Sequence, residues 1–443
     1  MFNNPMFRLK AGICNSSLLD TEPAYNESVT MDMAKTACDS IKNDDLRSWA
    51  IYTDEMRKRY QYRTYVLKNF ERALEQKEIT VYYQPVVRAY TGEVCGYEAL
   101  ARWESPDMGM LMPDVFISTL EEANLIPHLD AYVIQTVGED LQERRLKNLP
   151  VAPVSVNLSR IDFTSTDLLD FLDSIVQERG LQKSDLCLEV TETAMIRDSE
   201  LLRYGLKRLH DAGYRLFLDD FGSGCSSFGV LKDCAFHAVK IDQAFLRDFS
   251  DRSREIIASI VSMSKALGMH TLAEGAETEE QVRFLKEIGC EMIQGYYYGK
   301  PEPKENLAPA QIEKHYTSPI WDQAGFIKLN PSFSTAICVE DHGEPELVYM
   351  NSKFREAARK FSRSSSGKQI LGSFDQCSSE LKRRLRHLFM RAQKTGRLED
   401  MTFQQDSDNY HLFIQHLAGE QQYHVYYLEF YRISNSDKGI PDR

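Results

Sequence analysis

The sequence predicts an α/β protein whose main part is a (β/α)8 TIM-type barrel, with a partial α+β region before it and a small α+β domain after it. Between residues 79 and 305, short apolar runs alternate with amphipathic helices, and most of these runs end in a polar or charged side chain. Eight strand and helix units in roughly 225 residues match the size of one barrel. With 42% hydrophobic and 27% charged residues, the 443-residue chain has enough apolar material for a sizeable core.

Charge and cysteine usage exclude several classes of protein. A net charge of −13 argues against binding to a nucleic-acid polymer, because such binding needs cations that neutralise a run of phosphates. The nine cysteines are odd in number and include no C-x2-C pair, so neither a disulfide framework nor a zinc ribbon is indicated. No stretch supplies the roughly 20 apolar residues of a membrane helix. We therefore expect a cytoplasmic protein whose chain makes no membrane contact.

The first 60 residues predict too few elements to close a core of their own. They comprise a strand-like run at Phe7–Cys14, a helix at Val29–Ile41 and a second strand at Ser48–Tyr52. Residues 61–78 are charged and helix-prone, and they predict a helical connector to the barrel.

Residues 79–305 carry the barrel pattern. Helix ends are readable between the strands: a helix opens at Ser199 and stops at Gly213, and Thr278 with Gln281 forms a capping box before another. The apolar runs are interpreted as buried parallel strands at Ile79–Val87, Val94–Trp103, Pro153–Ser159, Leu186–Thr191, Arg215–Asp220, His237–Asp242, Met269–Glu274 and Glu291–Tyr296.

Residues 306–325 predict a polar linker, and residues 326–443 predict a small α+β domain. The helix at Glu380–Lys394 is basic, and either a solvated face or a docking surface explains that charge. The strands of this domain are expected at Ala336–Glu340, Glu346–Met350, His411–His416 and Tyr423–Tyr431.

The side chains that follow the barrel strands carry the functional signal. The C-terminal strand ends of a (β/α)8 barrel converge on one mouth, where active sites lie. Six carboxylates in one mouth, when Glu277 is included, would repel one another, so cations must share the site. Hard oxygen ligands of this kind suit Mg²⁺ or Mn²⁺, and a pair of such ions is the usual clamp for phosphodiester attack. The strand-end residues are Glu98, Asn157, Glu189, Asp219, Asp220, Lys240, Glu274 and Gln294.

A structural explanation exists for each of these residues alone. A single Asp or Glu after a strand is more often a helix N-cap or the partner of a salt bridge. Seven strand ends with such chemistry make that explanation improbable for the set. Histidines within the barrel are isolated and form no H-x-H or H-D pair, which disfavours a histidine-based metal site.

The run Tyr97–Trp103, with the letters YEALARW, resembles the motif that names the EAL family of cyclic di-GMP phosphodiesterases. The similarity covers about half of the chain. It continues in order through Gln84-Pro85, Ser155–Ser159, Glu189–Glu192, Asp219–Gly224, Lys240–Asp242, Ala273–Thr278, Gln294–Tyr296 and Pro301–Pro303.

The resemblance implies a role for each matching residue. The metal ligands would be Glu98, Asn157, Glu189 and Asp219 for one ion, with Asp219 bridging to a second ion that also meets Asp220 and Glu274. Glu274 and Lys240 would position or deprotonate the attacking water, supported by Glu277 and Gln294, while Glu192 would hold the loop after Asp220. The substrate would contact Gln84, Leu100, Arg102 and Asp242.

The implied function is a cyclic-guanylate-specific phosphodiesterase that opens cyclic di-GMP to linear 5′-pGpG by two-metal, in-line water attack. The family also implies a homodimer that couples to the metals through the loop Phe221–Phe228, in which Ser223 and Cys225 replace the usual Thr and Tyr. One alternative is a catalytically silent cyclic di-GMP receptor that acts through its outer domains. Another is an interaction role of those outer domains, with catalysis incidental.

The outer regions resemble two further families. Arg8–Ile13 and Met31–Lys35 resemble the late strand and helix of a GGDEF, or diguanylate cyclase, domain, but the Gly-Gly-Asp-Glu-Phe motif is absent. We therefore interpret residues 1–60 as a partial GGDEF-like region that makes no cyclic di-GMP. The stretch Leu347–Phe354 resembles a PAS-type sensor, so residues 326–443 are predicted to be a PAS-like domain.

Overall fold

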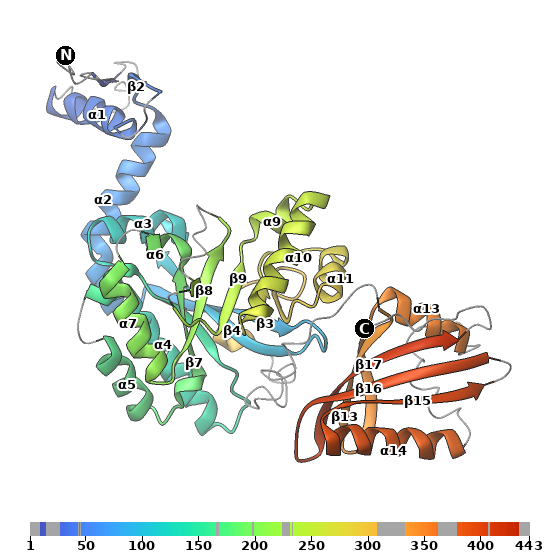
Figure 1. The fold of residues 1–443 in the computed structure, drawn as a ribbon. Coiled ribbons are helices and arrows are strands. Elements are labelled where there is room, and N and C mark those ends of the chain that lie inside the picture. The colour runs from blue at the N-terminus through green and yellow to red at the C-terminus, as the bar shows by residue number, and fades with distance from the viewer. Residues whose placement is uncertain are drawn as a thin grey trace. The chain divides into compact units, whose positions relative to one another are not determined.

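The computed structural model describes residues 9–14, 27–42, 44, 46–164, 168–196, 199–223, 231–232, 234–307, 333–361, 379–405 and 408–433 (Figure 1). The chain divides into two compact units, Met1–Thr80 with Ala101–Leu129, and Val81–Leu100 with Asp130–Arg443.

The N-terminal region has the elements that its sequence predicts. Strand β1 (Ala11–Ile13) pairs in parallel with β2 (Trp49–Ile51), and helix α1 (Glu27–Ser40) connects them. Phe7 and Arg8 lie outside the described residues. The connector begins earlier than predicted, because helix α2 spans Asp54–Glu75. Thr53 caps it by accepting a hydrogen bond from the N–H of Met56.

All eight predicted barrel strands are present. One sheet has the order β12-β3-β11-β10-β9-β8-β7-β6-β4-β5, and an additional pairing of β3 with β4 closes it. Two strands were not predicted, β5 (Gly109–Leu111) and β12 (Glu302–Pro303). The predicted ones are β3 (Ile79–Arg88), β4 (Val94–Ser105), β6 (Val154–Asn157), β7 (Leu186–Thr191), β8 (Arg215–Phe221), β9 (Ala238–Ile241), β10 (His270–Ala273) and β11 (Met292–Gln294).

The direction of β3 corrects the sequence interpretation of eight parallel strands. β3 pairs antiparallel with β11, whereas β4 pairs in parallel with β6, and the other consecutive pairs up to β11 are parallel as well. The physical reason is the short connection between Arg88 and Val94, since a parallel crossover needs a dozen or more residues. The N–H of Arg88 instead donates to the carbonyl of Glu93, which makes a hairpin turn.

Helices alternate with the barrel strands, and their ends follow local sequence signals. Helix α7 (Ser199–Asp211) is followed by Gly213 at φ 95°, and the capping box of Thr278 and Gln281 opens α11 as predicted. The others are α3 (Pro113–Glu122), α4 (Ile126–Leu146), α5 (Leu168–Glu178), α6 (Glu192–Ile196), α9 (Ala244–Arg247) and α10 (Asp251–Ala266), and α11 itself spans Glu279–Glu287.

The C-terminal domain is a five-stranded antiparallel sheet with the order β14-β13-β17-β16-β15. The predicted strands correspond to β13 (Thr335–Asp341), β14 (Glu344–Met350), β16 (Asp408–Glu420) and β17 (Tyr423–Ile433), while β15 (Leu398–Gln405) and helix α13 (Ser352–Phe361) were missed.

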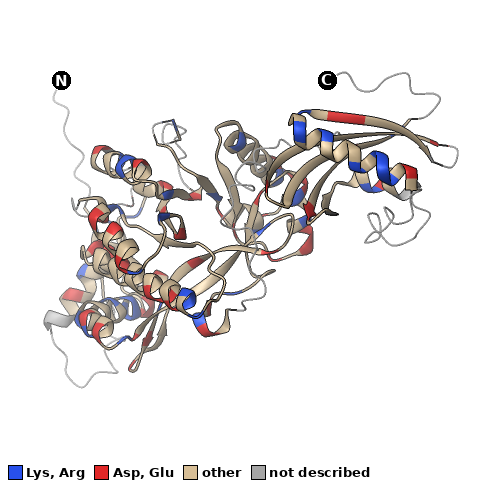
Figure 2. Ribbon diagram, turned by 90° about the horizontal axis from the view of Figure 1, so that it is seen from below, with Lys and Arg blue, Asp and Glu red and all other residues tan. Residues whose placement is uncertain are grey.

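Helix α14 (Ser379–Thr395) of this domain buries one face and exposes a basic one. Its leucines at 381, 385 and 388 belong to the core, and Phe389 packs edge-on against Tyr426 with ring centroids 4.8 Å apart. The bands of Lys and Arg along the helix are visible in Figure 2. Across the described residues, no helix combines the length and apolar character that a membrane crossing requires.

Candidate metal centre at one mouth of the barrel

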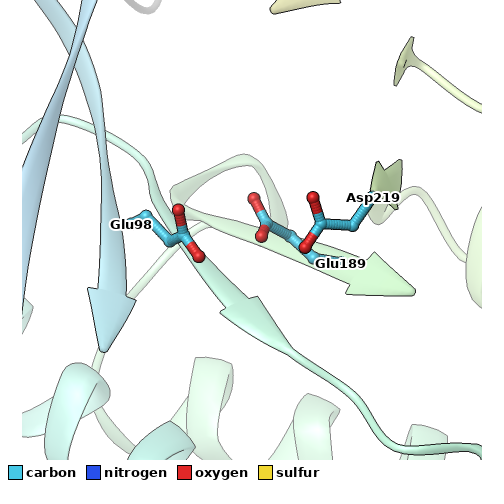
Figure 3. A group of neighbouring side chains, drawn as sticks. All are labelled: Glu98, Glu189 and Asp219. Carbon is cyan, nitrogen blue, oxygen red and sulfur yellow. The ribbon is translucent and has the colours of Figure 1, made fainter. Parts of the chain in front are cut away.

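Three carboxylates from three different strands face one another. Glu98 lies on β4, Glu189 on β7 and Asp219 on β8, and one oxygen of each lies within 4.8 Å of the others (Figure 3). All three are buried, and Glu189 is fully inaccessible to solvent. Buried carboxylates at this spacing repel unless cations lie among them, so the group has the donor chemistry of a divalent metal site.

A second carboxylate group shares one member with the first. Asp219, Asp220 and Glu274 also bring one oxygen each within 4.8 Å. Consecutive residues of a regular strand point to opposite faces, but the pairing of β8 with β9 shifts register between Leu218 and Phe221. Asp220 adopts φ 53°, and this bulge lets both aspartates contribute to one site.

The ammonium group of Lys240 lies among four of these carboxylates. Its Nζ is 2.6 Å from Glu189, 2.8 Å from Glu274, 3.0 Å from Asp219 and 3.4 Å from Glu98. Lys240 has no exposed surface. An unpaired buried ammonium would be costly, whereas this one offsets part of the charge of the carboxylates that surround it.

The protonation equilibria reflect this crowding. Burial raises the pKa of Glu189 well above its usual range and raises the pKa of Glu274 to about 8, although Lys240 acts in the opposite direction on both. Burial and the charge of Asp219 raise the pKa of Asp220 to about 6. Burial alone would lower the pKa of Lys240, but the carboxylates together raise it well above its ordinary value. Lys240 is therefore held as a cation.

Amide side chains orient Glu98 at the edge of the site. Gln294 Nε2 donates to Glu98 Oε2 at 2.6 Å and to Gln84 Oε1 at 3.1 Å. Asn157 Nδ2 donates to the other oxygen, Oε1, of Glu98 at 3.3 Å. Gln84 in turn donates to the carbonyl of Gly299 at 3.3 Å, so the reversed strand β3 contributes to the same mouth.

Glu192 lies at the start of α6 and contacts the segment after the paired aspartates. The N–H of Gly222 donates to Glu192 Oε2 at 2.9 Å, and Glu192 is 1% exposed. The resemblance to the EAL family implies that Glu192 holds this loop, and that role stays a prediction. Residues 224–228 of this loop, which include Cys225, lie outside the described residues.

The other predicted site residues differ in how closely they join this centre. Asp242 is buried and accepts a hydrogen bond from the N–H of Ala244, and its charge helps to raise the pKa of Asp220. Glu277 is exposed, lies just before the N-cap of α11 and belongs to neither carboxylate group. Leu100 and Arg102 are partly exposed residues of β4, and Arg102 Nη1 donates to the carbonyl of Ala101.

Comparison with known proteins identifies the barrel. The family model described as "EAL domain" matches residues 67–301, which is more than half of the chain. The chain belongs to the EAL-domain family. Its EAL relatives include the bifunctional diguanylate cyclase/cyclic di-GMP phosphodiesterase MucR of Pseudomonas aeruginosa, at 31% identity over 276 residues, 62% of this chain and 40% of MucR.

Two further EAL relatives are named as cyclic di-GMP phosphodiesterases. NbdA of Pseudomonas aeruginosa is 35% identical over 238 residues, 53% of this chain and 30% of NbdA. PdeR of Escherichia coli is 31% identical over 287 residues, 64% of this chain and 43% of PdeR. The chain therefore spans less than half of the length of these curated relatives.

A solved EAL structure supports the same assignment. The structure described as "PaMucR Phosphodiesterase, c-di-GMP complex" superposes with a TM-score of 0.52 at 33% identity, and covers 55% of this chain and 99% of that one. The closed eight-stranded barrel of this chain is thus the fold of EAL domains.

Proposed function

We propose that the EAL barrel hydrolyses cyclic di-GMP to linear 5′-pGpG with the aid of two Mg²⁺ or Mn²⁺ ions. The observation that carries this proposal is the position of Asp219, which belongs to both carboxylate groups. A carboxylate shared in this way suits a bridge between two cations. The named cyclic di-GMP phosphodiesterases among the relatives support the choice of substrate.

The residues present fit the proposed ions. Glu98, Glu189 and Asp219 supply oxygen ligands to one position, and Asn157, which touches Glu98, supplies an amide oxygen after rotation of its side chain. Asp219, Asp220 and Glu274 supply the other position. When bound, such ions would acidify a water molecule and stabilise charge that develops on the phosphate oxygens.

Lys240 and Glu274 divide the proton chemistry in this proposal. Lys240 is held protonated by its carboxylate neighbours, so it acts as a fixed positive charge that orients the water and the phosphate rather than as a base. Glu274 lies 2.8 Å from Lys240 and belongs to the carboxylate group shared with Asp219, so it is the carboxylate that we propose to accept a proton from the attacking water. Gln294 keeps Glu98 oriented, and Glu277 is proposed as a supporting group at the rim.

Substrate contacts are proposed for Gln84, Leu100, Arg102 and Asp242. Arg102 would meet a phosphate of the substrate, because a guanidinium matches the geometry of phosphate oxygens. Gln84 already belongs to the hydrogen-bonded chain that ends on Glu98, which supports a place beside the reacting phosphate.

The proposal also covers the assembly state of the protein and the regions outside the barrel. A homodimer, in which the loop Phe221–Phe228 couples subunit contact to metal affinity, is supported by the hydrogen bond between Gly222 and Glu192. A PAS-like role for residues 326–443 is supported by the antiparallel order β14-β13-β17-β16-β15, in which the first strand of the domain, β13, lies between β14 and the last strand, β17. The partial GGDEF-like identity of residues 1–60 and a cytoplasmic location stay predictions.

The test is incubation of the purified chain with cyclic di-GMP and Mg²⁺ or Mn²⁺, followed by chromatographic separation of the products. Formation of 5′-pGpG in proportion to time and enzyme is expected. Saturable binding of cyclic di-GMP without any product under both metals would favour the alternative, a catalytically silent receptor.

A further inference from the structure

The opposite mouth of the barrel holds a cavity of about 70 Å³ with its own chemistry. Residues from the N-terminal ends of seven strands or the positions just before them line it, together with the C-terminal end of the reversed strand β3. Four of its lining residues are basic in type, namely Arg88, Arg215, His237 and His270, which we call the basic ring. No Asp or Glu lines this cavity. In a chain with a net charge of −13, such a composition is unusual.

Strand periodicity separates the basic ring from the metal centre. Along β8, Arg215, Phe217 and Asp219 share the inward face, with Arg215 and Phe217 at the cavity and Asp219 among the carboxylates. Four residues of strand span about 13 Å. Leu272 lies between His270 and Glu274 along the chain, and it packs in an apolar cluster with Val86, which itself lines the cavity. A ligand at the basic ring would therefore not occupy the carboxylate site.

The hydrogen bonds of the two histidines orient them in ways that suit an anion. The N–H of Leu216 donates to His237 Nδ1 at 3.2 Å, which places the proton of a neutral imidazole on Nε2, as a donor. His270 Nδ1 contacts Glu291, and Lys265 Nζ lies 3.8 Å from the other oxygen of that carboxylate. The carboxylate of Glu291, which lies just before β11, thus contacts both His270 and Lys265.

We propose that the basic ring binds a small tetrahedral oxyanion, with inorganic phosphate as the ligand that fits it. A space of 70 Å³ is about five times the volume that one water needs, and phosphate has five non-hydrogen atoms. Guanidinium groups bind phosphate through paired, charge-assisted hydrogen bonds.

A structural role is the competing explanation, since polar residues at the N-terminal face of such barrels commonly serve stability. The two explanations differ in one observable, which is saturable binding. Equilibrium dialysis of the full chain against radiolabelled inorganic phosphate, with a chelator present, measures it. The chelator removes divalent metals, so that phosphate cannot bind through metal ions at the opposite mouth.

We expect about one phosphate per chain, with affinity weakened at least about tenfold in Arg215→Gln, because one charge-assisted contact is lost. The matched control is Arg252→Gln, which removes an exposed arginine of α10 and should bind phosphate as the wild type does. His237→Gln serves the same purpose as Arg215→Gln if that variant fails to fold by circular dichroism. Absence of saturable phosphate binding in the wild type would overturn the proposal. Site variants that bind phosphate with the same affinity as the wild type would overturn it as well.

A second arm distinguishes free phosphate from the phosphate of a nucleotide. Guanosine 5′-monophosphate should compete more weakly than inorganic phosphate, because the cavity has no room for a nucleoside. Tighter binding of the monophosphate that also depends on Arg215 would contradict the assignment to a free oxyanion. Neither binding experiment measures turnover, so a negative result in either would not bear on the proposed phosphodiesterase activity.

Discussion

The two mouths of the EAL barrel are built from the same strands and carry opposite charge. At one mouth, five carboxylates form two groups around the ammonium of Lys240. At the other, two arginines and two histidines line a cavity without any Asp or Glu. The contrast lies within single strands, since β8 carries Arg215 at one end and Asp219 at the other.

This difference teaches that the fold determines where side chains converge but not which chemistry they bring. Inward-facing positions recur every second residue, so each strand offers one residue to each mouth and one to the apolar layer between them. On β10 these are His270, Leu272 and, just past the strand, Glu274. The apolar layer keeps the opposite charges apart, so each mouth can be tested separately.

The largest effect should come from removal of divalent metal. We expect turnover of cyclic di-GMP to vanish after exhaustive chelation and to return with Mg²⁺ or Mn²⁺, because the carboxylate mouth then lacks the charge that activates water. Ca²⁺ should inhibit, since it prefers more ligands and longer bonds than this site requires. Full activity in the presence of excess chelator would show that the carboxylate mouth does not work through bound metal.

Glu98→Ala should lower turnover by about 100-fold or more while the barrel stays folded, because it removes an oxygen of the first carboxylate group. Steady-state rates at saturating metal measure the effect, and circular dichroism reports the fold. Glu178→Gln, at an exposed position on α5, is the matched control and should keep wild-type activity. A Glu98→Ala enzyme with more than about a tenth of wild-type turnover would exclude Glu98 as a ligand.

Lys240→Met should destabilise the metal-free protein by roughly 3–5 kcal/mol, because it leaves four carboxylates without their buried counter-ion. Urea unfolding in chelator gives the free energy of unfolding, and Lys207→Met on exposed α7 surface serves as control. Added Mn²⁺ should restore part of the loss. Equal stability of Lys240→Met and the control in chelator would mean that the ammonium does not hold this mouth together.

Glu192→Gln should have the smallest effect, a rise of about tenfold in the metal concentration needed for half-maximal activity. The amide can still accept from the N–H of Gly222, but the negative charge behind the loop is lost. Activity is measured across metal concentration, with Glu200→Gln as control, and light scattering across protein concentration gives the assembly state. An unchanged metal dependence, or a monomer with full activity, would contradict the proposed coupling between dimer formation and metal affinity.

Much of the barrel could be predicted from the sequence because its signals are local. Each strand is a short apolar run, and each strand end carries a polar residue at a fixed offset, so the convergence of Glu98, Glu189, Asp219 and Glu274 followed from topology alone. The capping box at Thr278 and the helix stop at Gly213 are equally local and were also predicted.

The features that were missed depend on pairing between distant residues. Nothing within Ile79–Val87 shows its direction, although the short connection to Val94 could have indicated a hairpin. The position of Lys240 among four carboxylates could not be predicted from its own strand, because those carboxylates lie on or just after four other strands. The basic ring was not predicted because its residues lie at the mouth opposite the C-terminal strand ends, where barrel active sites are expected. Counting back four residues from Asp219 to Arg215, or from Glu274 to His270, would have found two of its members.

The reversed strand β3 also bears on how the chain reaches its folded state. Its hairpin with β4 forms from residues that are near in sequence, but its other edge pairs with β11, which lies some two hundred positions later. During synthesis that partner emerges last, so the hydrogen-bonding edge of β3 stays open until nearly the whole domain has been made. Such a long-range pairing is slow to form. A chain that ends before Met292 should therefore expose an unpaired strand edge and aggregate, whereas one that ends after Pro303 can complete the ring.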